Sequence, residues 1–211
     1  MRKHIELLVE RYPILESIQD DIYEAYKVMK TCYENGGKLL IAGNGGSAAD
    51  SEHIVGELMK GFVKKRKVDP YFAAALKVVD EETGSQLADM IQMGLPAIAL
   101  TGHNALTTAY MNDMDPLFCF AQQLNGYGKS GDVFLGISTS GNSKNVYAAA
   151  VVAKAKGMKV IGLAGRDGGK LAENSDVAIV VPVQETYQIQ ELHLPIYHAL
   201  CLMLEDYFYK E

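Results

Sequence analysis

Tryptophan is absent from this sequence and cysteine is scarce, with three cysteines among 211 residues. Cys32, Cys119 and Cys201 lie far apart, their number is odd, and none forms a CxxC pair. This spacing indicates neither a disulfide framework nor a cysteine zinc site. We expect three buried, reduced thiols, as is common in cytosolic proteins.

Long apolar runs and an excess of positive charge are also missing. No stretch approaches the roughly 18 apolar residues of a membrane span, and the N-terminus has no apolar signal segment, so we expect a cytoplasmic protein without a membrane partner. The 20 Lys and Arg residues are outnumbered by 26 Asp and Glu residues, which gives a formal net charge of −6. Nucleic-acid binding needs a clustered basic surface, so we expect no nucleic-acid partner. An anionic substrate must instead be held by local donors.

Residues 1–35 contain no glycine and carry apolar side chains at helical spacing. One stripe covers residues 5–12 and ends at Pro13, and a second covers residues 14–33. Such helices need a cover for their apolar faces, which either this domain or another subunit could provide. We predict an N-terminal helical arm over residues 1–36.

After Gly37 the pattern changes to short runs that are apolar on both faces. These runs are Leu39–Ala42, Ala97–Leu100, Val133–Ile137, Val160–Leu163 and Val177–Val181. They are separated by helical stretches over 47–62, 116–125, 143–157 and 188–209. Such an alternation predicts an α/β domain over residues 37–211, with a doubly wound, five-stranded parallel sheet flanked by helices. Ligands of such sheets bind outside the carboxyl ends of the strands.

Residues 63–95 are an irregular insert in this domain. The insert begins with the basic run Lys64–Lys67, which we interpret as a solvated turn rather than a binding site. It then passes Pro70, and its pattern predicts a short helix near 81–92.

Two turns that follow predicted strands are candidates for ligand binding. The first is Gly43-Asn44-Gly45-Gly46-Ser47, where glycines let the backbone approach a ligand and the next helix offers free N–H groups. The second, STSGNS over residues 138–143, carries four hydroxyls. Helix capping accounts for one or two of them, so four favour a phosphate site. Neither turn has a P-loop or dinucleotide-binding pattern.

Two of the predicted helices carry polar side chains that suit catalysis. His53 and Glu57 are spaced i, i+4 on one face, and Gln190 and His198 lie in the C-terminal stretch. Taken singly, each is an ordinary surface or core-edge residue. Beside a phosphate loop they become candidates for acid–base and metal roles. Pro195 predicts a kink or a helix start within the C-terminal stretch.

The sequence resembles the phosphoheptose isomerases, a family of sugar isomerase (SIS) domain proteins. The resemblance is carried by GNGGSAADSEHIVGEL, GDVFLGISTSGNSKNV, GMKVIGLAGRDGGKLAENSDVAIVVP and QIQELHLPIYH, which occur in the family's order and cover residues 14–62 and 96–209. It implies a flavodoxin-like SIS fold and a homotetramer with active sites at subunit boundaries. It also implies conversion of sedoheptulose 7-phosphate to D-glycero-D-manno-heptose 7-phosphate.

The same resemblance assigns roles to matching positions. The phosphate-binding set is Ser138, Thr139, Ser140 and Ser143. The other substrate-binding positions are Asn44, Gly45, Gly46, Glu57, Asn112, Asp113 and Gln190. Glu57 falls on the family's catalytic glutamate and His198 on its catalytic histidine. One zinc ion per subunit is implied at His53, Glu57, Gln190 and His198.

The sequence departs from the family at three places. Residues 63–95 are much longer than the family's connection, and Gly61, beside Lys60, replaces an arginine. Tyr187-Gln188 also differs from the usual polar and charged pair. These departures leave the acid and the base in place, and they bear on which sugar is used.

An aldose–ketose isomerase moves a proton between C1 and C2 through a cis-enediol, for which one base and one acid suffice. We assign Glu57 as the base and His198 as the acid or proton shuttle. A zinc ion would polarise the carbonyl oxygen, although a glutamate bound to zinc is a poorer base. Gln190 and His198 lie about 12 Å apart on an ideal helix. Joint binding of zinc therefore needs a kink at Pro195, long side chains or two subunits.

Two other functions stay open. One is a non-catalytic SIS protein that binds a phosphosugar or a protein partner. Paralogues of that kind have lost the acid and the base, whereas Glu57 and His198 are both present here. The other is an isomerase of a different phosphosugar, because the loops that read the length of the carbon chain differ.

Overall fold

The computed structural model describes residues 1–210 and contains a five-stranded sheet in which every paired strand is parallel. The strands are β1 (Leu39–Ala42), β2 (Ala97–Ala99), β3 (Val133–Ser138), β4 (Lys159–Gly165) and β5 (Val177–Val181). Their order is β2-β1-β3-β4-β5, so the chain leaves β1 to one side for β2 and crosses to the other for β3. The predicted doubly wound fold and its five strands are confirmed.

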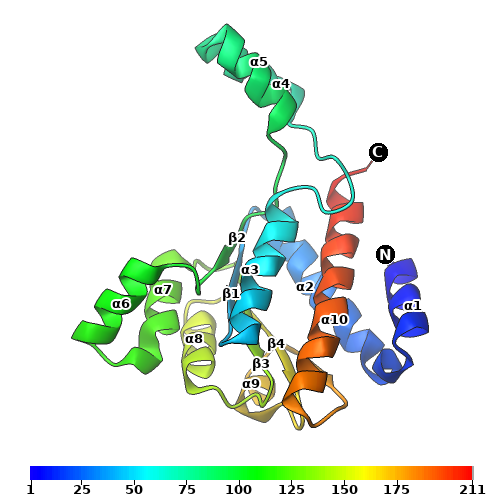
Figure 1. Cartoon of the computed structure of the whole chain (residues 1–211), viewed down its shortest axis with the longest axis vertical. Coiled ribbons are helices and arrows are strands. Elements are labelled where there is room, and N and C mark those ends of the chain that lie inside the picture. The colour runs from blue at the N-terminus through cyan, green and yellow to red at the C-terminus, as the bar shows by residue number, and fades with distance from the viewer. Residues whose placement is uncertain (211) are drawn as a thin grey trace.

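Helices cover both faces of the sheet (Figure 1). One face is covered by α1 (Arg2–Arg11), the 3-10 turn η1 (Pro13–Ile18), α2 (Gln19–Glu34), α3 (Gly46–Met59) and α10 (Thr186–Phe208). The other is covered by α7 (Cys119–Tyr127), α8 (Lys144–Ala155) and α9 (Gly169–Glu173). Beside α7 lie α6 (Asn104–Asp113) and the 3-10 turn η2 (Pro116–Phe118). The sequence pattern did not predict α6 or α9.

Strand residues alternate between two hydrophobic cores. Leu39 and Ile41 of β1 belong to the core under α2 and α10, whereas Leu40 and Ala42 belong to the core under α7 and α8. All four are fully or almost fully buried. The apolar runs therefore have no polar face because helices pack on both sides of the sheet.

The N-terminal helices are covered by their own chain. Ile5 and Leu8 of α1 and Ile22 and Met29 of α2 are buried in the core that contains α10. The apolar faces of these helices are therefore covered by this domain, which is one of the two possibilities that the sequence left open. The three cysteines are free and buried, as predicted. Within residues 1–210, no helix is long and apolar enough to cross a membrane.

The insert forms a helical hairpin that projects from the body of the molecule (Figure 1). It consists of α4 (Pro70–Val79) and α5 (Glu81–Met90). The sequence predicted α5 but not α4, because the apolar segment PYFAAALKVV has almost no polar face to reveal a helical period. Asp69 caps α4, and Asp80 caps α5 by accepting a hydrogen bond from the Thr83 N–H group.

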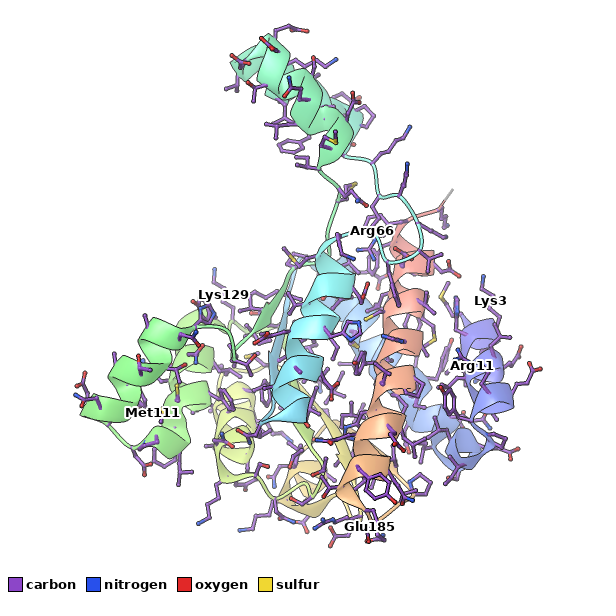
Figure 2. The ribbon with its side chains drawn as sticks, in the orientation of Figure 1. Lys3, Arg11, Arg66, Met111, Lys129 and Glu185 are labelled. Atoms are coloured by element: carbon purple, nitrogen blue, oxygen red, sulfur yellow. The ribbon has the colours of Figure 1, made fainter. Side chains whose placement is uncertain are left out.

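A buried ion pair between Arg66 and Glu205 of α10 anchors the base of this hairpin. Figure 2 shows Arg66 beside the ends of α3 and α10. Arg66 Nε donates to Glu205 Oε1 at 2.9 Å, and both side chains are almost completely buried. The two remaining guanidinium nitrogens donate to the carbonyl oxygens of Leu58 (2.6 Å) and Glu57 (3.0 Å) at the end of α3. The prediction of a solvated turn over Lys64–Lys67 is therefore wrong for Arg66, because the carboxylate and free helix carbonyls compensate its desolvation.

We predict that Glu205→Gln lowers the free energy of unfolding by about 3–5 kcal/mol, because it leaves the Arg66 charge buried without a counter-ion. Burial alone would raise the pKa of Glu205, but N–H groups of Phe62 and Val63 and the Arg66 guanidinium hold it below its ordinary value. The stabilisation is therefore present at neutral pH and disappears as the pH falls through this lowered pKa. Urea denaturation at several pH values measures both effects.

The matched control is Glu24→Gln, which removes an exposed i, i+3 ion pair with Lys27. Exposed pairs contribute about 0–1 kcal/mol, so this variant should unfold close to the wild type. Equal midpoints for the Glu205 and Glu24 variants would contradict the anchoring role of the buried pair.

Candidate active site

The two candidate loops lie next to each other at the carboxyl end of the sheet. β1 and β3 are adjacent, and the strand order reverses between them, so the loops that follow them diverge and leave room for a ligand. The side chains of Asn44 and Asn145 exchange two hydrogen bonds, of 2.9 and 2.8 Å, across this gap. The sequence singled out Asn44 but not Asn145, which follows the hydroxyl loop by two residues.

The hydroxyl loop lies between β3 and the first turn of α8. The buried Ser138 Oγ is 2.9 Å from Ser143 Oγ, and Ser140 Oγ accepts a hydrogen bond from the Asn142 N–H group. Thr139 and Ser140 are half-buried. The loop therefore combines hydroxyls with the N-terminus of a helix, which suits an anion such as phosphate.

Beside this loop lies a cavity of about 320 Å³ lined by Ser140, Asn142, Arg166, Asp167 and Gln184. Arg166 adopts a positive φ of 58° and donates hydrogen bonds to the Gln184 carbonyl oxygen and to Thr186 Oγ1. Sequence reasoning missed this arginine. The available signal was its place just after the end of the predicted fourth strand, at the same edge of the sheet as the hydroxyl loop.

A second group of predicted residues lies farther along α3 and α10. His53 Nε2 is 3.1 Å from Glu57 Oε1, and the ring centroids of His53 and His198 are 5.0 Å apart. The ring of Phe62 packs on His198 at 5.3 Å between centroids. The structure thus brings His53, Glu57 and His198 into one cluster, which we call the acid–base cluster.

Tyr197 and Asp50 support this cluster, and the sequence pattern identified neither. The Tyr197 hydroxyl donates to Asp50 Oδ1 at 3.1 Å and lies 3.0 Å from His53 Nδ1. Because the hydroxyl gives its hydrogen to Asp50, Nδ1 must donate to it, and Nε2 of a neutral His53 carries no hydrogen. Nε2 and the Glu57 carboxylate then face each other as two acceptors. A proton or a metal cation between them would resolve this conflict.

Two buried atoms of the acid–base cluster have no hydrogen-bond partner, namely Glu57 Oε2 and His198 Nε2. The Lys60 ammonium lies 3.6 Å from Glu57 Oε2. Burial is the largest cause that lowers the pKa of His198 below its ordinary value; a protonated neighbouring His53 would add to this shift, and Glu57 opposes it. His198 is therefore neutral at pH 7. Buried polar atoms normally have a hydrogen-bond partner, so these two atoms are suited to bind a water molecule, an ion or a ligand atom.

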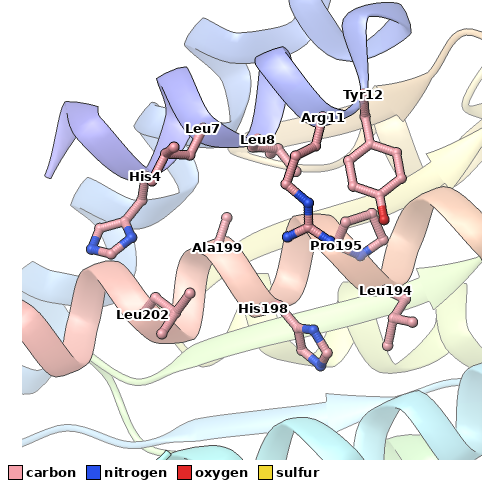
Figure 3. A pocket seen from close by; sticks show the side chains of 10 residues that line it. All are labelled: His4, Leu7, Leu8, Arg11, Tyr12, Leu194, Pro195, His198, Ala199 and Leu202. Carbon is pink, nitrogen blue, oxygen red and sulfur yellow. The ribbon is translucent and has the colours of Figure 1, made fainter. Parts of the chain in front are cut away.

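His198 also lines a cavity of about 390 Å³ between α1 and α10 (Figure 3). The α1 side of this cavity includes the side chains of Arg11 and Tyr12 (Figure 3). His198 is the one member of the acid–base cluster among the lining residues, and its ring points away from α1 (Figure 3). This cavity shares no lining residue with the cavity beside the hydroxyl loop.

Other predicted site residues lie apart from the acid–base cluster. The Gln190 amide lies against the first loop, where a Cβ atom on Gly46 would be 2.7 Å from Gln190 Nε2. α10 continues through Pro195, so the predicted helix start near Pro195 is wrong and Gln190 stays two turns from His198. Asn112 and Asp113 bond to each other at 2.9 Å on the exposed end of α6.

The acid–base cluster has the donor chemistry of a zinc site. Two imidazoles and one carboxylate form a known ligand set of catalytic zinc, and the Asp50–Tyr197 pair orients His53 as a second shell would. In residues 1–210, however, no three His, Cys, Asp or Glu side chains are arranged to bind one metal ion. To bind a metal ion, the Glu57 carboxylate would have to give up its contact with His53. Gln190 of the same chain lies apart from these three side chains.

Comparison with known proteins agrees with this architecture. The sequence matches the family described as SIS domain over residues 8–88 and 73–165. A phosphoheptose isomerase from Geotalea daltonii is 40% identical and aligns with 94% of this chain and 92% of its own. One from Nitratiruptor is 38% identical, over 99% of this chain and 100% of its own. The solved phosphoheptose isomerase structures from Neisseria gonorrhoeae and Francisella tularensis both have a TM-score of 0.74, at 32% and 31% identity, covering 97% of this chain and 96% of theirs.

The fold, with its hydroxyl-rich loop at the reversal of strand order, is therefore that of an SIS-domain protein. Sequence identity of about 40% over most of both chains identifies the family as well as the fold. The chain belongs to the phosphoheptose isomerase family.

We predict that Gly141→Ala destabilises the protein more than Gly45→Ala. Both glycines have positive φ, of 65° and 56°, so each substitution should cost about 1–3 kcal/mol in backbone strain. A Cβ on Gly141 would also lie 1.8 Å from the Gly168 carbonyl oxygen, whereas a Cβ on Gly45 would meet nothing within 4 Å. Urea denaturation of both variants provides the comparison. Equal stabilities would show that the hydroxyl loop does not pack tightly against Gly168.

Proposed function

We propose that this chain is a phosphosugar aldose–ketose isomerase that converts sedoheptulose 7-phosphate to D-glycero-D-manno-heptose 7-phosphate through a cis-enediol. The observation that carries the proposal is the acid–base cluster, where Glu57 and His198 come from different helices and each keeps a buried atom without a hydrogen-bond partner. The hydroxyl loop in the same chain supports a phosphorylated substrate. Relatives named phosphoheptose isomerase support the seven-carbon sugar.

In this proposal Glu57 takes the proton from the substrate carbon, and neutral His198 moves a proton between the two oxygens. The hydroxyls of Ser138, Thr139, Ser140 and Ser143 hold the distal phosphate. Phosphate binding far from the reacting carbons contributes orientation, because remote binding energy is used to place C1 and C2. Asn44, Gly45, Gly46, Asn112, Asp113 and Gln190 would contact the rest of the sugar.

We further propose that the acid–base cluster holds zinc, with His53, Glu57 and His198 as ligands. Zinc would supply a Lewis acid that polarises the carbonyl and enediolate oxygens. The lone acceptor Nε2 of His53 and the unpartnered atoms of Glu57 and His198 support this assignment. Gln190 would join the site only from another subunit or after a rearrangement of α10.

The active site is proposed to form between subunits of a cytoplasmic homotetramer. The supporting observation is that the cavity at His198 and the cavity at the hydroxyl loop have no lining residue in common. A second copy of the chain could bring one of these groups to the other. Closed symmetric assembly is the usual way in which a chain repeats such a contact.

We predict that Glu57→Gln and His198→Asn each lower kcat by about 10²–10⁴-fold with little change in KM, because general acid–base groups contribute that much. The assay uses C5, C6 and C7 ketose phosphates. It therefore also tests the alternative that the enzyme isomerises a phosphosugar of another length. Ser140→Ala with Ser143→Ala is the matched variant, which should raise KM instead. Near-normal turnover of a stable, folded Glu57→Gln protein would favour a non-catalytic binding protein.

We predict that the purified protein contains zinc and that His53→Ala lowers the zinc content, measured by elemental analysis, and the isomerase rate together. Tyr197→Phe keeps every ligand but removes the hydroxyl that fixes the His53 tautomer. Loss of an outer-shell partner should weaken metal affinity by about 10–100-fold. Full activity in the presence of a chelator that has removed all zinc would refute a catalytic metal without affecting the acid–base proposal.

A further inference from the structure

The α4–α5 hairpin exposes large apolar side chains that no part of residues 1–210 covers. No residue of α4 is buried, and Tyr71, Val78 and Val79 are 87%, 86% and 87% exposed. Met90, at the end of α5, is 81% exposed. An apolar surface of this kind indicates an interaction site rather than ordinary scattered exposure.

The hairpin is a defined structure and not a loose loop. Gly84 of α5 packs so closely on α4 that a Cβ atom there would lie 2.3 Å from the Leu76 carbonyl oxygen. At the base, Lys67 and Gln92 form an antiparallel bridge. Gln92 Oε1 also accepts hydrogen bonds from the N–H groups of Gly61 (3.1 Å) and Arg66 (3.3 Å). The two helices of the hairpin therefore hold a defined position relative to each other and to the base.

Apolar and charged side chains are distributed along the hairpin in a complementary way. Tyr71 and Met90 lie at the base, which joins the body, whereas Val78 and Val79 lie at the tip. Charges separate along the same axis. The exposed carboxylates at the tip are Asp80, Glu81 and Glu82, and the exposed ammonium groups at the base are Lys65 and Lys67. Asp69 at the base and Asp80 at the tip are both engaged as helix caps. Lys77 near the tip and Asp89 near the base weaken the separation of the remaining charges without reversing it.

We infer that the hairpin is a docking surface for a second copy of this chain. The two hairpins pair antiparallel about a two-fold axis, so that the tip of each lies on the base of the other. A two-fold contact is self-complementary, because both copies use the same surface. The part of the partner that the tip touches must therefore also be part of the hairpin surface. The antiparallel pairing puts apolar tip against apolar base and carboxylates against ammonium groups. A parallel pairing would instead bring the carboxylates of both tips together.

The size of the hairpin limits the strength of this contact. Each ten-residue helix is about 15 Å long, so one face of the pair is smaller than the ~800 Å² per partner of a standard interface. The contact is therefore weak by itself. It adds to association between chains that are already joined elsewhere or present at high concentration.

Disulfide cross-linking of the full-length double variant Val79→Cys, Met90→Cys tests this pairing. The three native cysteines are buried, so they do not compete for mild oxidation. Tip and base of one hairpin are too far apart for a bond within the chain. The expected result is a covalent dimer for the double variant and several-fold less for either single variant. A dimer from Val79→Cys alone in the same yield as from the double variant would show tip-to-tip contact, and no dimer from the double variant would show that the hairpins do not pair in this way. Either result overturns the proposal.

Charge reversal in the same background tests the register. Glu81→Lys with Glu82→Lys should lower the yield of the covalent dimer several-fold, and adding Lys65→Glu with Lys67→Glu should restore it. Val151→Glu, at an exposed valine of α8 outside the hairpin, is the matched control for a surface charge change and should leave the yield unchanged. Circular dichroism confirms that each variant is folded. A yield that falls further in the combined charge variant contradicts the antiparallel pairing.

Discussion

The adjacency of β1 and β3 is the constraint on which the candidate site depends. Both strands are buried on two faces, so their side chains serve the cores and chemistry is confined to the loops at their carboxyl ends. Since the chain leaves these two strands in opposite directions, the loops separate and expose the N-termini of α3 and α8. Asn44 and the hydroxyl loop meet there because of strand order, although 101 residues separate Asn44 from Asn145.

The acid–base cluster depends on how α3 and α10 pack side by side. Gly46 lies against Gln190 near the start of both helices, and His53 lies against Tyr197 and His198 farther along. The ends of the two helices are joined by the buried Arg66–Glu205 pair, where Arg66 also binds the Glu57 carbonyl oxygen. A guanidinium in this place fixes the backbone of the proposed base.

The insert changes the surface of the molecule more than its site. Its helices contribute nothing to either core, and its base is held by Gln92 and by the same Arg66–Glu205 pair. The buried pair thus connects the proposed catalytic helix, the C-terminal helix and the projecting hairpin.

The sequence by itself determined the sheet, its strands and the hydroxyl loop. A strand covered on both faces must be apolar throughout, and four hydroxyls beside a helix start exceed what capping needs, so both features are local. Resemblance to a family then indicated Glu57 and His198. Only the tertiary structure decided that Arg66 is buried, that Tyr197 and Asp50 fix the His53 ring, and that His53 lies against His198. The physical reason is that burial, tautomer and distance depend on partners far away in the chain, such as Glu205, 139 residues from Arg66.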